Sequence, residues 1–269
     1  MGLFYTKTYE TNKMKTKAKR EKAGSSPSLM TSSDYICLLS GFGKFGGGSY
    51  NPSQDTVESF PDILITQGES KAARVRKRAK EVHIEKVVLE TVGKTAWKNL
   101  KGKLQKLPEN KPVVLVMTGL AEGIKGLHLE RFAMNLRDYR IKDMSGAQIV
   151  DKPIIKSAQD LIRTTLPLDK LSESLGKSGI PCRVSNHAGT FICNELYFNA
   201  MHHTQAIKAV KACLFVHMPL AEEFAEVCRK AKNKKLKARA MAANSREKQI
   251  ELLRDALAEV IEGVVKTIA

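Results

Sequence analysis

Three segments of the sequence carry side chains that could act together as a nucleophile, a base and a carboxylate. Cys193 lies between an apolar run and a helical stretch, His217 ends another apolar run, and Glu130 follows a third. The partial positive charge at a helix N-terminus favours a nearby thiolate, the nucleophilic form of cysteine. A histidine can exchange a proton with that thiol, and a carboxylate can fix the imidazole tautomer. If the fold brings them together, such a set could carry out acyl transfer to a thiol.

Taken singly, each of these residues is better explained by a structural role. Cys193 is compatible with a buried thiol, His217 with a histidine in a core, and Glu130 with a surface salt bridge. Only a fold that brings the three segments together would favour the chemical interpretation.

Short apolar runs alternate with helical stretches along the sequence. They predict the strands and helices that must position Cys193, His217 and Glu130. Strands are predicted at residues 35–39, 83–89, 112–117, 181–185 and 213–217, and helices at 95–107, 160–178 and 193–203. Residues 51–53 open a further helix, and residues 220–262 form one or two long ones. This alternation predicts an α/β fold with a mostly parallel sheet. Ligand crevices in such sheets lie at the carboxyl ends of strands, where His217 is expected.

Four motifs occur in the order and spacing of one known family. They are residues 41–47 (GFGKFGG) with 51–53 (NPS), residues 119–123 (GLAEG) with 130–135 (ERFAMN), residues 188–194 (AGTFICN) and residues 215–219 (FVHMP). Together they resemble pyroglutamyl peptidase I, the intracellular cysteine peptidases that remove N-terminal pyroglutamate. The resemblance covers about residues 34–220. One departure is Lys44, which replaces a proline of the glycine-rich loop.

The resemblance implies a role for each matching residue. Cys193 is the implied nucleophile, His217 the base and Glu130 the third member of a triad. Arg140 is implied at the oxyanion site together with Cys193. The implied lining of the pyroglutamyl pocket is Phe42, Phe45, Ile141, Phe191 and Ile192. The implied fold is a three-layer α/β/α sandwich around a mostly parallel twisted sheet, and the implied substrates are peptides with N-terminal pyroglutamate.

No metal or other cofactor is expected. His202 and His203 are adjacent, so on a helix they point to different faces, and no cluster of cysteines or acids accompanies them.

The net charge of +17 raises the alternative of a non-enzymatic α/β protein that associates with RNA. The charge is concentrated in residues 1–33, 71–80 and 229–239, so the remainder of the chain is almost neutral. We therefore expect solvated basic segments and no nucleic-acid groove. A third alternative is another hydrolase on a related fold, such as a nucleoside phosphorylase or a peptidyl-tRNA hydrolase.

We expect two parts in the chain: a disordered basic N-terminal extension at residues 1–33, and a single peptidase domain at 34–269 with a basic helical segment at about 220–269. Five cysteines without paired spacing favour a reducing, cytoplasmic location. Membrane association is expected only if Gly2, which fits a loose acylation pattern, is myristoylated. The expected assembly is a monomer or small homo-oligomer.

Overall fold

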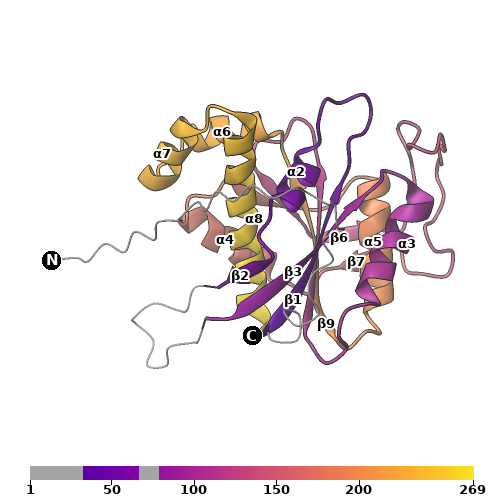
Figure 1. Ribbon diagram of the computed structural model, residues 1–269. Coiled ribbons are helices and arrows are strands. Elements are labelled where there is room, and N and C mark those ends of the chain that lie inside the picture. The colour runs from indigo at the N-terminus through magenta and orange to yellow at the C-terminus, as the bar shows by residue number, and fades with distance from the viewer. Residues whose placement is uncertain (1–32, 67–78) are drawn as a thin grey trace, which may run out of the picture.

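The structure is a computed structural model that describes residues 33–66 and 79–269 (Figure 1). Residues 1–32 of the predicted N-terminal extension, Gly2 included, and most of the first internal basic run lie outside the described residues, whereas Ser33 is described and buried. No helix within the described ranges is both long enough and apolar enough to cross a bilayer.

A seven-stranded sheet forms the centre of the fold. Its strands, in spatial order, are β2 (Ile63–Ile65), β3 (Glu81–Leu89), β1 (Tyr35–Phe42), β4 (Val113–Leu120), β9 (Val210–Met218), β5 (Leu127–Glu130) and β8 (Cys182–Ser185). Strands β3, β1, β4 and β9 are parallel, β5 pairs antiparallel with β9, and β8 pairs parallel with β5. The edge strand β2 is antiparallel to β3.

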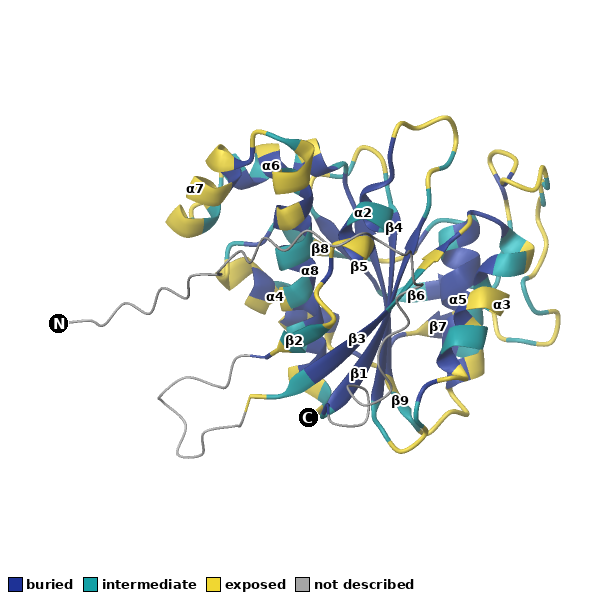
Figure 2. Ribbon diagram, in the orientation of Figure 1, coloured by how far each residue is buried: buried dark blue, intermediate teal, exposed yellow. Residues whose placement is uncertain are grey.

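Helices cover both faces of the sheet, as Figures 1 and 2 show. One face carries α3 (Gly93–Leu104) and α5 (Ile192–Thr204). The other carries α2 (Pro52–Glu58), α4 (Leu168–Lys177), α6 (Ala221–Arg229), α7 (Lys234–Ala242) and α8 (Arg246–Ile268). Each layer of helices and the sheet face beneath it share one hydrophobic core. The predicted three-layer α/β/α arrangement is confirmed.

The central strands are near-continuous apolar runs because both of their faces are buried, and every residue of β1 is buried. Successive side chains of a strand point to opposite faces. In β9, Leu214 and Val216 therefore enter the core under α8, whereas Phe215 enters the core under α5. The same alternation places His217, two residues after Phe215, on the α5 face.

Two predicted helical regions differ from the structure. Residues 160–178 begin with strand β7 (Leu161–Arg163), which pairs with β6 (Phe132–Met134) in a small second sheet, and only then form α4. The C-terminal region contains three helices, because the helical conformation ends after α6 and again after α7. Ser245 then caps the start of α8. The basic run at 229–239 covers the end of α6 and most of α7.

Candidate active site

The candidate nucleophile Cys193 is the second residue of α5, as its sequence position predicted. The N–H groups in the first turn of a helix have no partner within the helix, and they carry the positive end of its dipole. Gly189, in the turn before the helix, has a φ of 75°, a left-handed conformation that glycine adopts without strain. The Cys193 side chain is partly exposed, so a substrate can reach it.

Asn194 fixes the start of α5. Its amide group donates hydrogen bonds to the carbonyls of Met134 (2.9 Å) and Leu136 (3.0 Å), and its oxygen accepts one from the Met134 N–H (2.9 Å). Asn194 has no exposed surface, so these bonds are shielded from water. They tie the helix that carries Cys193 to strand β6 and the loop that follows it. Sequence analysis assigned Asn194 no role.

The candidate base and carboxylate lie together on the α5 face of the sheet. His217, near the carboxyl end of β9, has its Nδ1 2.8 Å from Oε1 of Glu130, the last residue of β5. Both residues are buried. The Tyr197 hydroxyl of α5 donates a hydrogen bond to the backbone carbonyl of Glu130 (3.0 Å) and so ties the helix to β5.

The two partners of the imidazole favour its charged form. Burial lowers the pKa of His217, but hydrogen bonds with Cys193 and Glu130 and the charges of both partners outweigh that effect and raise the pKa to about 9. The second carboxylate oxygen of Glu130, Oε2, is buried and has no hydrogen-bond partner among the described residues. Because an unpaired buried charge is costly, the carboxylate depends on the His217 proton for compensation.

Gly119, at the end of β4, gives the thiol its space. It is the register partner of His217. A Cβ at this position would lie 3.0 Å from the Cys193 sulfur and 3.1 Å from the Phe215 ring. Sequence analysis recognised Gly119 only as part of a motif. The structure shows that a side chain here would displace the sulfur.

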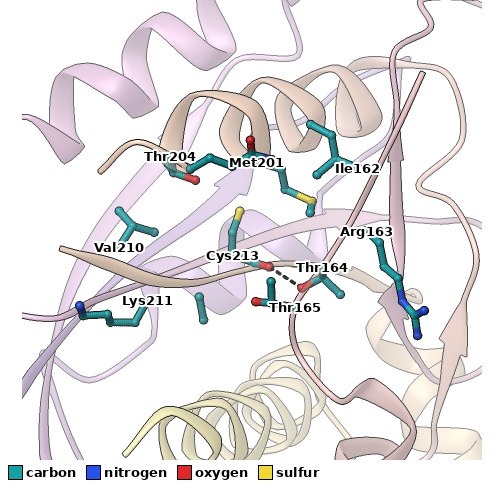
Figure 3. A pocket seen from close by; sticks show the side chains of 11 residues that line it. Ile162, Arg163, Thr164, Thr165, Met201, Thr204, Val210, Lys211 and Cys213 are labelled. Carbon is teal, nitrogen blue, oxygen red and sulfur yellow. Dashed lines mark hydrogen bonds between the residues drawn. The ribbon is translucent and has the colours of Figure 1, made fainter. Parts of the chain in front are cut away.

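The other four cysteines are free thiols in different environments. Burial raises the pKa of Cys37, Cys182, Cys213 and Cys228. A thiol with a raised pKa carries little thiolate at neutral pH and reacts slowly. A pocket of about 290 Å³ at the far end of α5 is lined partly by Cys213, whose carbonyl accepts a hydrogen bond from Thr164 (Figure 3). That pocket contains none of the residues expected to do chemistry.

The residues expected to line the pyroglutamyl pocket occupy three different environments. Phe45 and Phe191 are partly exposed and in ring contact, with centroids 5.4 Å apart. Phe42 and Ile192 are buried in the core under α5. Ile141 is 37 % exposed on the loop after β6.

Arg140 lies on the same loop as Ile141, and its side chain is exposed. The described residues show no hydrogen bond or ion pair between its guanidinium and the Cys193–His217–Glu130 group. No group of three or more histidine, cysteine or acidic side chains that could hold a metal ion occurs in the described part of the chain.

Comparisons with known proteins give one consistent result. The profile of the pyroglutamyl peptidase family matches residues 36–241. A pyrrolidone-carboxylate peptidase of Vibrio vulnificus is 36 % identical over 188 residues, which cover 69 % of this chain and 79 % of that protein.

Solved structures agree. The pyrrolidone carboxyl peptidase of Pyrococcus furiosus matches with a TM-score of 0.68 and 26 % identity, and that of Fervidobacterium islandicum with 0.65 and 27 %. Each match covers 87 % of this chain and all of the other. The predicted family and the predicted class of enzyme are confirmed, and the chain belongs to the pyroglutamyl peptidase family of cysteine peptidases.

Proposed function

We propose that this protein removes N-terminal pyroglutamyl residues from peptides by acyl transfer to Cys193. The observation that carries the proposal is the hydrogen-bonded pair of His217 and Glu130 on the face of the sheet where α5 presents the Cys193 thiol. The pKa of His217, raised to about 9, supports an imidazolium beside Cys193 at neutral pH. Membership of the pyroglutamyl peptidase family supplies the substrate class.

In the first half of the reaction, the Cys193 thiolate attacks the carbonyl carbon of the pyroglutamyl residue. His217 gives its proton to the nitrogen of the leaving peptide as the C–N bond breaks, which leaves a thioester on Cys193. In the second half, neutral His217 takes a proton from water. The hydroxide attacks the thioester, free pyroglutamate leaves, and the proton on His217 again faces the thiolate. Glu130 holds the imidazole in one tautomer throughout.

The tetrahedral intermediate of each half needs donors for its oxyanion. The backbone N–H of Cys193, in the first turn of α5, is free to donate. Arg140 is the proposed second donor. Because its side chain is exposed, this role requires the loop after β6 to bring the guanidinium to the bound substrate.

An apolar pocket suits this substrate because pyroglutamate is a lactam and has no N-terminal charge. A peptidase that anchors an ammonium group cannot hold it, whereas aromatic walls and backbone groups can. Phe45 and Phe191 are the proposed walls, with Phe42 and Ile192 behind them and Ile141 at the rim. The two rings are in contact, so the lactam enters by parting them. Gly46 and Gly47 follow Phe45, and both adopt a positive φ that glycine tolerates without strain.

The experiment that tests the proposal compares a fluorogenic pyroglutamyl amide with the corresponding alanyl amide. We expect hydrolysis of the first and none of the second. Cys193→Ala and His217→Ala should each reduce kcat by at least about 10⁴-fold. Iodoacetamide should inactivate the protein and label Cys193, since burial raises the pKa of the other four thiols.

A Cys193→Ala protein with turnover near the wild-type rate would contradict the proposed nucleophile. A wild-type protein without activity on the pyroglutamyl amide would contradict the proposed substrate. The expected cytoplasmic location remains part of the proposal and is supported by five free cysteines. The expected monomer or small homo-oligomer remains part of the proposal as well.

A further inference from the structure

A tyrosine and a carboxylate that the proposed reaction does not use are buried together behind the candidate pocket. Glu195 lies in the first turn of α5, two residues after Cys193. The hydroxyl of Tyr139, on the loop after β6, donates a short hydrogen bond to its Oε2. Tyr139 is 2 % exposed and Glu195 is 7 % exposed. Burying both groups is costly unless they are paired, so the pair requires a structural or functional explanation.

The tyrosine connects this pair to the aromatic walls. The Tyr139 ring packs edge-on against Phe191, with centroids 5.0 Å apart and an angle of 80° between the rings. Phe191 in turn contacts Phe45 at 5.4 Å. Edge-to-face contacts of this kind have a preferred geometry. The position of the Tyr139 ring therefore restricts where the Phe191 ring can lie.

The surroundings of the pair leave it little freedom. A Cβ at Gly93, the first residue of α3, would lie 2.4 Å from the Tyr139 hydroxyl and 2.9 Å from Glu195 Oε2. The backbone N–H of Gly93 donates to Asp143 (3.1 Å), which also accepts hydrogen bonds from Ser145. The tyrosine is thus enclosed by α3, α5 and the turn at Asp143.

Charge compensation comes from Arg137, whose guanidinium lies 3.8 Å from Glu195 Oε1. The same guanidinium donates to the carbonyls of Pro153 (2.7 Å) and Ile154 (3.3 Å). Burial raises the pKa of Glu195, while the Tyr139 hydrogen bond and the Arg137 charge act in the opposite direction. The loop after β6 therefore supplies both partners of the carboxylate.

We propose that Tyr139 and Glu195 are a positioning pair that holds the Phe191 wall in place and so sets the affinity for the pyroglutamyl ring. The inference rests on the proposed function. The pair acts on binding more than on the rate of attack, because the start of α5 has its own anchor. Asn194 fixes the turn that carries Cys193 through three hydrogen bonds to Met134 at the end of β6 and Leu136 just after it.

Two single variants test the pair. Tyr139→Phe removes the hydroxyl and keeps the ring against Phe191, and Glu195→Met removes the acceptor at similar volume. Each should raise the KM for a pyroglutamyl amide about fivefold to tenfold, the effect of one net hydrogen bond, with kcat within about threefold of the wild type. The competitive inhibition constant of 2-pyrrolidone, the lactam ring alone, should rise in parallel, since it measures ring binding without acyl transfer.

Rescue by a conservative variant separates positioning from charge. The side-chain oxygen of Glu195→Gln can still accept from Tyr139, so its KM should stay within about threefold of the wild type. The double variant Tyr139→Phe/Glu195→Met should show no larger effect than either single variant, because both remove the same bond.

The matched control is Thr204→Val at the other end of α5. It removes a buried hydroxyl that donates to the Ala200 carbonyl (2.7 Å) beside the pocket of Figure 3. Its KM and 2-pyrrolidone constant should equal those of the wild type. Thermal unfolding shows which variants are folded. If Glu195→Met does not fold, the test rests on Tyr139→Phe alone.

The inference is overturned if the 2-pyrrolidone constant of folded Tyr139→Phe matches the wild type, or if kcat falls while KM stays constant. Either result leaves the proposed function intact, because wild-type hydrolysis is measured in the same assay. Absence of wild-type hydrolysis would instead contradict the proposed function itself.

Discussion

Nδ1 of His217 lies 2.8 Å from Oε1 of Glu130, although 87 positions separate the two residues in the chain. The contact exists because β5 runs antiparallel beside β9, with His128 opposite His217 in the register. Alternation along both strands then turns Glu130 and His217 toward α5. A base and its carboxylate are thus held by backbone pairing, whereas the thiol is held by a helix.

Replacing Glu130 by glutamine should lower kcat for a pyroglutamyl amide by about 10²- to 10³-fold. The loss is smaller than that expected for Cys193→Ala, since the carboxylate orients the base and does not itself react. Steady-state kinetics of the purified variant provide the measurement. The control is Glu173→Gln on the surface of α4, which should not change kcat. A Glu130→Gln enzyme with wild-type kcat would exclude Glu130 from the proposed triad.

The same substitution should lower the pKa of His217. The hydrogen bond and the charge of Glu130 both raise that pKa, which stands at about 9, and glutamine supplies no negative charge. The imidazolium should therefore persist to a higher pH in the wild type than in the variant. Titration of the histidine resonances by NMR measures both values. A His217 pKa that does not fall would contradict the prediction.

Gly119→Ala should reduce kcat by about tenfold or more. The new Cβ would lie 3.0 Å from the Cys193 sulfur, so the thiol must shift from its position beside His217, and small displacements of a reacting group are costly. Overpacking should also lower the free energy of unfolding by about 1–3 kcal/mol.

Gly102→Ala in α3 is the control for Gly119→Ala, because a Cβ there meets no atom within 4 Å. Alanine in a helix should stabilise the protein by about 0.5–1 kcal/mol without changing kcat. Equal kcat values for Gly119→Ala and the wild type would show that the thiol does not need this space.

Asn194→Ala should lower the free energy of unfolding by about 2–4 kcal/mol. It leaves the Met134 N–H and the carbonyls of Met134 and Leu136 without their buried partner. Denaturant unfolding measures the change. Asn199→Ala, which loses one bond to the Glu195 carbonyl at a partly exposed position, should cost less than about 1 kcal/mol. Similar losses for the two variants would contradict the role given to Asn194.

Apolar runs were sufficient to predict the central strands and α5, because β1 is buried throughout and β4, β9 and α5 are buried over most of their length. They were not sufficient for β5, which contains only four residues, or for β6 and β7, which contain three each. Segments this short have no measurable periodicity, and their pairing partners are distant in sequence. The helix predicted at 160–178 was wrong at its start for this reason.

The candidate site could likewise be predicted only in part from the sequence. The types and spacing of Cys193, His217 and Glu130 identified the residues that could react, and the resemblance gave them roles. Asn194, Tyr139 and Glu195 could not be recognised in this way. Their function depends on contacts between α5 and the loop after β6, and 60 positions separate Asn194 from its partner Met134.

The antiparallel entry of β5 between β9 and β8 also has a consequence for folding. The pair of His217 and Glu130 is completed only when β5 docks on β9, because each residue is carried by one of these two strands. A chain in which β1, β3, β4 and β9 have already paired would contain a sheet and a thiol but no oriented base. The strand pairing that completes the sheet therefore also completes the candidate site, and a chain that lacks the β5–β9 pairing should lack peptidase activity.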